Sequence, residues 1–167
     1  MRSMESVAKQ VAEEGLFLAL ALVASYIETL LPLSFAVPGI KLGLANAVVM
    51  VLLYQRGKKS AILVSILRIL LAAVMFQGVF TIIYSLAGAF FSLAVMLYFK
   101  KRNYFGVVGV SVLGGVCHNL GQLLTAVVIV ENKAVFYYFP VLLIAGVVSG
   151  CIIGILTGEI IKRFKIC

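Results

Sequence analysis

The sequence contains no Asp and no Trp, has only three Pro, and carries few charges of either sign. Charged residues make up 12% of the 167 residues, whereas soluble domains carry about 25%. All six acidic residues are Glu and they are scattered, so the chain has no Asp-rich motif for a hard divalent cation. It also has no P-loop of the form Gly-x-x-x-x-Gly-Lys-Ser/Thr. We therefore expect neither an enzymatic activity nor ATP hydrolysis from this chain by itself.

Cysteine is equally sparse. Cys117, Cys151 and Cys167 show no Cys-x-x-Cys or other metal-ligand spacing. The first two lie within apolar runs, where Cys usually behaves as a small hydrophobic residue. We expect no disulfide, no metal site and no cofactor.

Apolar residues are what the chain has in abundance. They make up 63% of it, and the mean hydropathy is +1.18. An ordinary soluble domain is about 45–50% apolar, so this composition predicts an integral membrane protein, with residues 1–167 forming a single transmembrane domain. The first apolar run lacks a small-residue cleavage site, so no cleavable signal peptide is expected.

Six apolar segments can be marked, each close to the roughly 20 residues that cross a bilayer. They predict an all-α integral membrane protein, a bundle of six transmembrane helices. The second segment is short. The expected segments are 14–31, 41–54, 60–76, 79–99, 104–130 and 136–161.

Basic residues mark one set of helix ends. If both termini are cytoplasmic, the inner ends carry Arg2, Lys9 and nine clustered cations, while the outer ends carry only Lys41 and Lys133. The clusters are Arg56/Lys58/Lys59, Lys100/Lys101/Arg102 and Lys162/Arg163/Lys165. The positive-inside rule then predicts a plasma-membrane protein with both termini in the cytoplasm. The net charge of +8 is explained by anionic lipid headgroups and needs no nucleic acid.

One charge breaks the apolar pattern. Arg68 lies in the middle of the third segment, near the expected centre of the bilayer, where a charge costs several kcal/mol unless it is paired or hydrated. Arginine cannot lose its proton, because its pKa is above about 12. An intramembrane charge of this kind indicates a functional site by default.

Other polar residues fall at a similar depth, in the outer halves of the segments. His118, Asn119 and Gln122 are spaced to share one side of a helix. Together with Arg68 they predict a polar pocket open to the outside and covered by residues 32–38, suited to a small organic molecule with an anionic end. The candidate substrate-binding residues are Glu28, Lys41, Asn46, Arg68, Tyr84, His118, Asn119 and Gln122.

Structural explanations compete with this one. Arg68 and Glu28 could neutralise each other, because buried charges are normally paired whatever their role. Glu13 and Glu14 are interpreted as the start of a helix, where carboxylates favour the dipole. In the first segment, Ala21-x-x-x-Ser25 forms a small-residue stripe, which favours close approach of another helix, either within the chain or from a partner.

The chain resembles one family throughout. The residues that carry the resemblance are Glu28-x-x-x-Pro32, Pro38-Gly-Ile-Lys-Leu-Gly-Leu-Ala-Asn46, Arg68, Gly78, Ser85 with Gly88, and His118-Asn-x-Gly-Gln122. The family is the integral membrane group labelled heptaprenyl diphosphate synthase component I, also called the Gx transporter family. It is similar to the S components of energy-coupling factor transporters, which are six-helix micronutrient binders.

That similarity implies partners. S components dock on a transmembrane T subunit and two ATPases, and an Ala-x-x-x-Ala stripe on their first helix contacts the T subunit. The nearest match here is Ala21-x-x-x-Ser25, which departs from that stripe at its second position. The resemblance thus implies the substrate-binding component of a micronutrient importer.

Two alternatives stay open. The chain could be an accessory membrane subunit of isoprenoid or quinone biosynthesis that binds a prenyl diphosphate, although without Asp it cannot form the synthase active site alone. It could also be a structural membrane subunit whose polar cluster only fixes the register of the helices.

Overall fold

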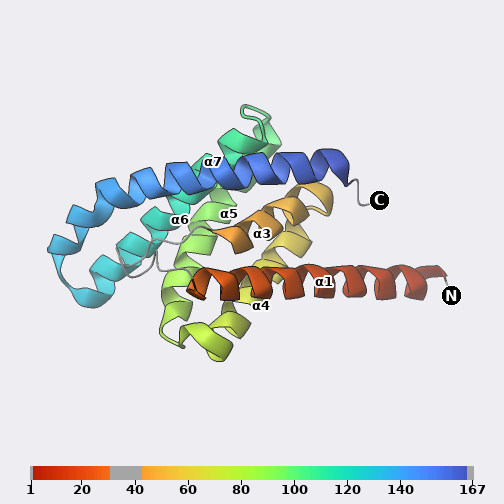
Figure 1. Cartoon of the computed structure of the whole chain (residues 1–167), viewed down its shortest axis with the longest axis horizontal. Coiled ribbons are helices and arrows are strands. Elements are labelled where there is room, and N and C mark those ends of the chain that lie inside the picture. The colour runs from red at the N-terminus through yellow and green to blue at the C-terminus, as the bar shows by residue number, and fades with distance from the viewer. Residues whose placement is uncertain (1, 31–42, 165–167) are drawn as a thin grey trace.

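The computed structural model describes residues 2–30 and 43–164, with side chains from residue 7 onward. Within these ranges the chain forms a bundle of six α-helices without strands (Figure 1). The helices are α1 (Arg2–Leu30), α3 (Leu44–Gln55), α4 (Lys58–Ala72), α5 (Thr81–Arg102), α6 (Val107–Val130) and α7 (Phe139–Arg163). A π-helical turn, η1 (Ala73–Gln77), extends α4, and a 3₁₀ turn, η2 (Lys133–Tyr138), precedes α7.

The helices have the length and composition of membrane spans. Five described segments are long and apolar enough to cross a bilayer, and α3 is a shorter apolar helix of 12 residues. At 1.5 Å per residue α3 is about 18 Å long, less than the ~30 Å hydrocarbon core. Large apolar side chains are exposed along every helix except α3, as expected where lipid rather than water is the solvent. The prediction of an all-α membrane bundle is confirmed.

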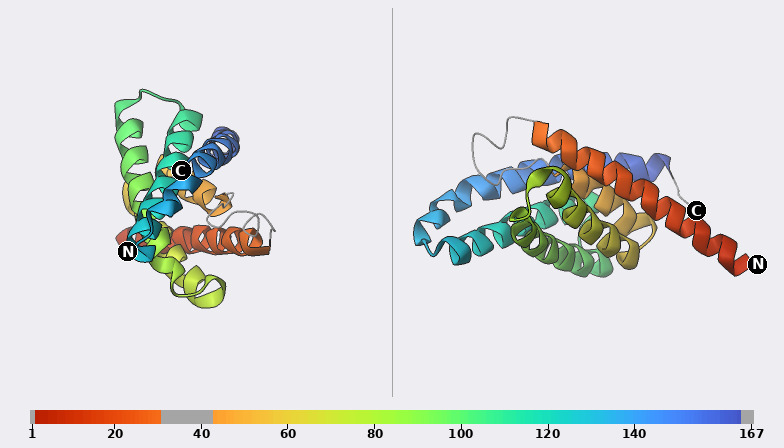
Figure 2. Two further views of the ribbon diagram at one scale, coloured as in Figure 1. Left: turned by 90° about the vertical axis from the view of Figure 1, so that its left-hand side faces the viewer. Right: turned by 90° about the horizontal axis from the view of Figure 1, so that it is seen from below.

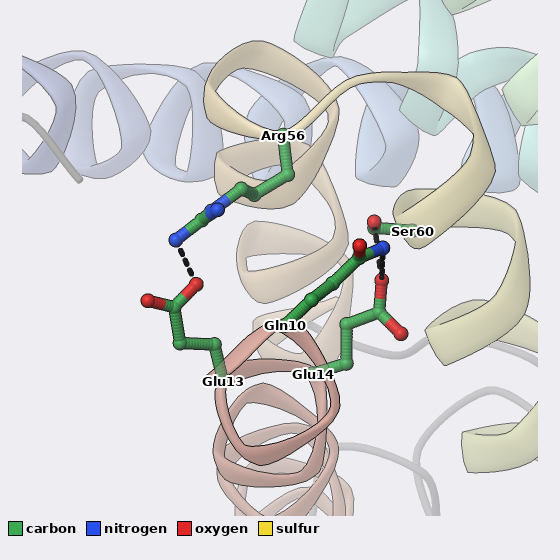
Figure 3. A network of polar contacts seen from close by, with 5 residues as sticks. All are labelled: Gln10, Glu13, Glu14, Arg56 and Ser60. Carbon is green, nitrogen blue, oxygen red and sulfur yellow. Dashed lines mark hydrogen bonds and ion pairs between the residues drawn. The ribbon is translucent and has the colours of Figure 1, made fainter. Parts of the chain in front are cut away.

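Helix α1 begins much earlier than the sequence suggested. It starts at Arg2 rather than near residue 14, and its first turns project beyond the other helices (Figures 1 and 2). Glu13 and Glu14 therefore lie inside the helix, and their interpretation as a helix start was wrong. Instead, Glu13 forms a salt bridge with Arg56, and Glu14 accepts a hydrogen bond of 2.5 Å from the Ser60 hydroxyl (Figure 3).

The described members of the basic clusters gather at one end of the bundle (Figure 1). There the Gln55 side chain donates to the Phe164 carbonyl at 2.5 Å, and the Lys100 ammonium donates to the Leu53 carbonyl. The first turns of α1 and the last turn of α7 lie at this same end (Figure 1). The α3–α4 turn, the end of α5 and the end of α7 are thus neighbours.

The small-residue stripe of α1 faces inward. Ala21 and Ser25 are both fully buried against other helices of the chain. Ala21 belongs to the apolar core, with Val49, Leu52 and Val64 around it. In this structure the stripe is therefore used for internal packing, one of the two alternatives that the sequence left open.

Candidate functional site

Arg68 lies on the face of α4 that packs against the rest of the bundle. The buried residues of this helix recur at helical spacing, at 60, 61, 64, 65, 68, 69 and 72, while Leu63 and Leu67 are exposed on the opposite face. Arg68 itself is only 8% exposed. The guanidinium is therefore directed into protein and away from the lipid-facing surface.

The contacts of this guanidinium come from α1. Its Nη1 donates to the Ser25 hydroxyl at 3.3 Å, and the Glu28 carboxylate attracts it electrostatically. Its Nε is buried and has no hydrogen-bond partner among the described residues. A buried N–H without a partner costs about 1–3 kcal/mol, so this site retains donor capacity for a further group.

A small polar cavity surrounds Arg68. Its volume is about 20 Å³, and about 10–15 Å³ is enough for a single water molecule. The cavity in this conformation is therefore of water size. It is lined by Glu28, Gly43, Ala45, Asn46, Arg68, Ser85, His118 and Gln122, which come from α1, the start of α3, α4, α5 and α6.

The cavity lies between the middle of the bundle and the end away from the basic clusters. Arg68 is ten residues from the start of α4, and His118 is eleven residues from the start of α6. At 1.5 Å per residue these positions are about 15 Å and 17 Å along their helices, close to the centre of a ~30 Å hydrocarbon layer. Glu28, by contrast, lies in the last turn of α1.

Glu28 also anchors α3. Its Oε1 accepts a hydrogen bond of 2.5 Å from the backbone N–H of Leu44, the first residue of α3. A carboxylate is favourable there because the helix N-terminus carries exposed N–H groups and a partial positive charge. The preceding Gly43 has φ +76°, a left-handed conformation that favours glycine. One carboxylate thus links α1, α3 and the charge on α4.

His118 and Gln122 reach the cavity across a glycine. They are four residues apart on α6, and both side chains lie against Gly88 of α5. A Cβ at position 88 would be 2.9 Å from Gln122 Cγ and 3.0 Å from the His118 ring. The absence of a side chain at Gly88 therefore creates the space that these two groups occupy.

The structure brings together five of the eight candidate residues, namely Glu28, Asn46, Arg68, His118 and Gln122.

The other three have different positions. Asn119 is buried at the α6–α7 contact, where its side chain donates to the Leu142 carbonyl at 2.8 Å, a structural hydrogen bond. Tyr84 is half-buried on α5 and does not line the cavity. Lys41 and the expected cover of residues 32–38 lie outside the described residues.

The remaining lining residues were not among the candidate binding residues, although all three lie in the stretches that carry the family resemblance. Ser85 follows Tyr84 directly, and it is Ser85 that shares the buried face of α5 with Gly88, three residues later. That Ser-x-x-Gly spacing was the available signal. Gly43 and Ala45 line the cavity beside their neighbour Asn46, and their chemistry alone gave no indication of this position.

Together these features define a class, a polytopic helical membrane protein with a charged polar cavity inside the bundle. A family model described as heptaprenyl diphosphate synthase component I matches residues 17–160. The chain therefore belongs to that family, as the resemblance predicted. Searches among curated proteins and among solved structures gave no match.

Proposed function

We propose that the chain is the substrate-binding membrane component of an importer of the energy-coupling factor type. It would capture a small organic molecule with an anionic group from the outer face of the plasma membrane, with both termini in the cytoplasm. The observation that supports this proposal is the buried Arg68 in a polar cavity to which five parts of the bundle contribute.

The roles of the side chains follow from their chemistry. Arg68 would bind a carboxylate or phosphate through its planar fork of donors, the geometry in which arginine is strongest. Asn46, His118 and Gln122 would supply neutral hydrogen bonds that orient the rest of the molecule. Lys41 stays a prediction for the outer mouth.

The cavity must enlarge to act in this way. A water-sized space cannot hold an organic molecule, for which pockets of about 300–1,000 Å³ are usual. Enlargement requires α1, α3 and α4 to move relative to α5 and α6, since the cavity lies between these two groups of helices. We propose that substrate binding is coupled to this movement.

Energy would come from other subunits. The chain has no nucleotide-binding motif, so a transmembrane T subunit and two ATPases would drive release, and the chain itself would catalyse no reaction. Because Ala21 and Ser25 are buried, the T subunit would contact the opposite face of α1, where Leu16, Leu20 and Val23 are exposed.

The test is Arg68→Ala, with Leu67→Ala as a matched control on the lipid-facing side of the same helix. Small molecules that co-purify with each protein are identified by mass spectrometry, and folding is checked by size-exclusion chromatography. We expect Arg68→Ala to lose the bound molecule by at least tenfold, because several kcal/mol of charge-assisted hydrogen bonding disappear. Equal retention in both variants would contradict the proposal.

A second candidate is favoured by the family description, which names a component of a synthase. In that case the chain would be an accessory membrane subunit of isoprenoid biosynthesis, and a separate enzyme component would be its partner. Affinity purification from native membranes separates the two candidates. Recovery of a prenyltransferase supports the synthase subunit, and recovery of a T subunit with ATPases supports the importer.

A further inference from the structure

A second hollow lies at the basic end of the bundle, far along α5 from the Arg68 cavity. It is open, has a volume of about 440 Å³, and is lined by Tyr98, Lys101 and Arg102 in the last two turns of α5. All three lining residues lie on one helix, so the hollow is an open surface site, in contrast to the enclosed cavity around Arg68.

The three consecutive cations at the end of α5 have different surroundings. Lys100 is directed inward, where its ammonium donates to the Leu53 carbonyl and lies 4.8 Å from the centre of the Tyr54 ring. The Arg102 guanidinium lies over the Tyr98 ring, 5.7 Å from its centre.

Lys101 forms no hydrogen bond or ion pair with any described residue. The described salt bridges, Glu13–Arg56 and Glu159–Lys162, involve other cations. Two positive charges therefore border the hollow with no carboxylate from the described residues to neutralise them.

An exposed apolar path leads from this hollow toward the middle of the bilayer. Phe90, Ala94, Tyr98 and Lys101 follow one another at intervals of four, four and three residues, so they share one face of α5. Phe90 is 70% exposed and Tyr98 is 55% exposed. Lys101 is eleven residues after Phe90, so the two are separated by about 16 Å along the helix, roughly half the hydrocarbon thickness.

From this arrangement we infer a binding site for a terminal phosphate or diphosphate carried on a hydrocarbon chain. Lys101 and Arg102 bind the phosphate oxygens, and stacking on Tyr98 holds the guanidinium in place for this contact. The hydrocarbon chain lies along the Phe90–Ala94–Tyr98 face, one leaflet deep. The site is independent of the importer proposal, because it shares no residue with the Arg68 cavity.

The test compares two double variants of equal charge change, Lys101→Gln/Arg102→Gln and Lys58→Gln/Lys59→Gln. Lys58 and Lys59 are also exposed, at the start of α4 and at the same end of the bundle. Binding to the purified protein in detergent is measured by native mass spectrometry. The probes are dioleoyl phosphatidate, farnesyl diphosphate, dioleoyl phosphatidylcholine and inorganic pyrophosphate.

We expect phosphatidate, farnesyl diphosphate or both to bind the wild-type protein more tightly than phosphatidylcholine and pyrophosphate. The α5 double variant should weaken that binding by about tenfold, while the α4 double variant changes it by less than twofold. The amphiphile that binds more tightly identifies the source of the phosphate, a phospholipid or a prenyl diphosphate.

Two results would overturn the inference. Equal weakening in the two double variants would mean that anions are attracted to the basic surface in general and not to a specific site on α5. If pyrophosphate bound as tightly as farnesyl diphosphate, the apolar face of α5 would make no contribution to binding. Unchanged thermal unfolding midpoints in both variants establish that the differences are not caused by misfolding.

Discussion

The two halves of the bundle are packed in different ways. Helix α6 contacts both α5 and α7 extensively, and glycines let the backbones of each pair approach closely. On α7, Gly146, Gly150 and Gly154 recur every four residues and lie against the backbone of α6. Helices α1, α3 and α4 make fewer mutual contacts, through larger side chains and through polar contacts at the basic end.

The difference between the halves bears on the Arg68 cavity, which lies between them. The closely packed half presents Ser85, His118 and Gln122, and the loosely packed half presents Glu28, Asn46 and Arg68. A close-packed unit keeps neutral hydrogen-bonding groups in fixed positions, whereas a looser unit can move its charged groups at lower cost. Under the importer proposal, the comparison therefore places positioning in one half and movement in the other.

Breaking the close packing should have the largest effect. A Cβ at Gly150 would lie 2.6 Å from Val112 Cα and 3.0 Å from the Ser111 carbonyl oxygen, both backbone atoms that cannot rotate away. We expect Gly150→Ala to destabilise the protein by about 2–3 kcal/mol, the upper range for overpacking. Thermal unfolding in detergent measures this, with Gly158→Ala as the control.

Gly158 continues the same four-residue spacing on α7, but a Cβ there meets nothing within 4 Å. Its replacement by Ala should leave stability unchanged or slightly raised, because Ala is the better helix former. Equal destabilisation by the two substitutions would mean that close approach of α6 and α7 is not what distinguishes this half.

A smaller effect on stability, but a strong one on binding, is expected from Gly88→Ala. The added methyl group would press on the His118 ring and on Gln122 Cγ, so both side chains must shift from their positions beside the cavity. We expect a loss of small-molecule binding of about tenfold with destabilisation of only about 1–2 kcal/mol. Co-purifying molecules and thermal unfolding report the two effects separately, and a parallel loss of both would argue against a local change.

Much of this fold could be predicted from the sequence, because apolar segments and basic flanks are direct consequences of the bilayer. The start of α1 could not be predicted. Residues 2–13 are largely polar and indicated a region outside the apolar segment, but they belong to the same helix. Within that helix Glu13 forms a salt bridge with Arg56, a partner more than 40 residues away. Hydropathy contains no information about that contact.

For the candidate site, the residue types were predictable and the fine geometry was not. A lone Arg68 in an apolar run had to face protein, and His118 and Gln122 at i, i+4 had to share a side of α6. Asn119 fits the same pattern equally well, yet the rotation of α6 directs it to the Leu142 carbonyl of α7. That rotation is set by glycine packing between helices, and pairwise packing of this kind is not encoded in the period of one segment.

The smallest of the expected effects concerns how α1 is held in the looser half. Glu13 and Arg56 form a salt bridge whose side chains are 23% and 24% exposed, whereas those of the Glu159–Lys162 pair are 52% and 74% exposed. We expect Glu13→Gln to destabilise the protein by about 1 kcal/mol, because it leaves a partly buried guanidinium without its carboxylate, and Glu159→Gln to have no measurable effect. Thermal unfolding at low and high salt distinguishes them, since partly buried pairs are screened less than exposed ones. If both substitutions had the same small effect, the Glu13–Arg56 pair would not help to hold α1, and the looser half would owe its position to the packing of Ala21 and to the other hydrogen bonds of α1.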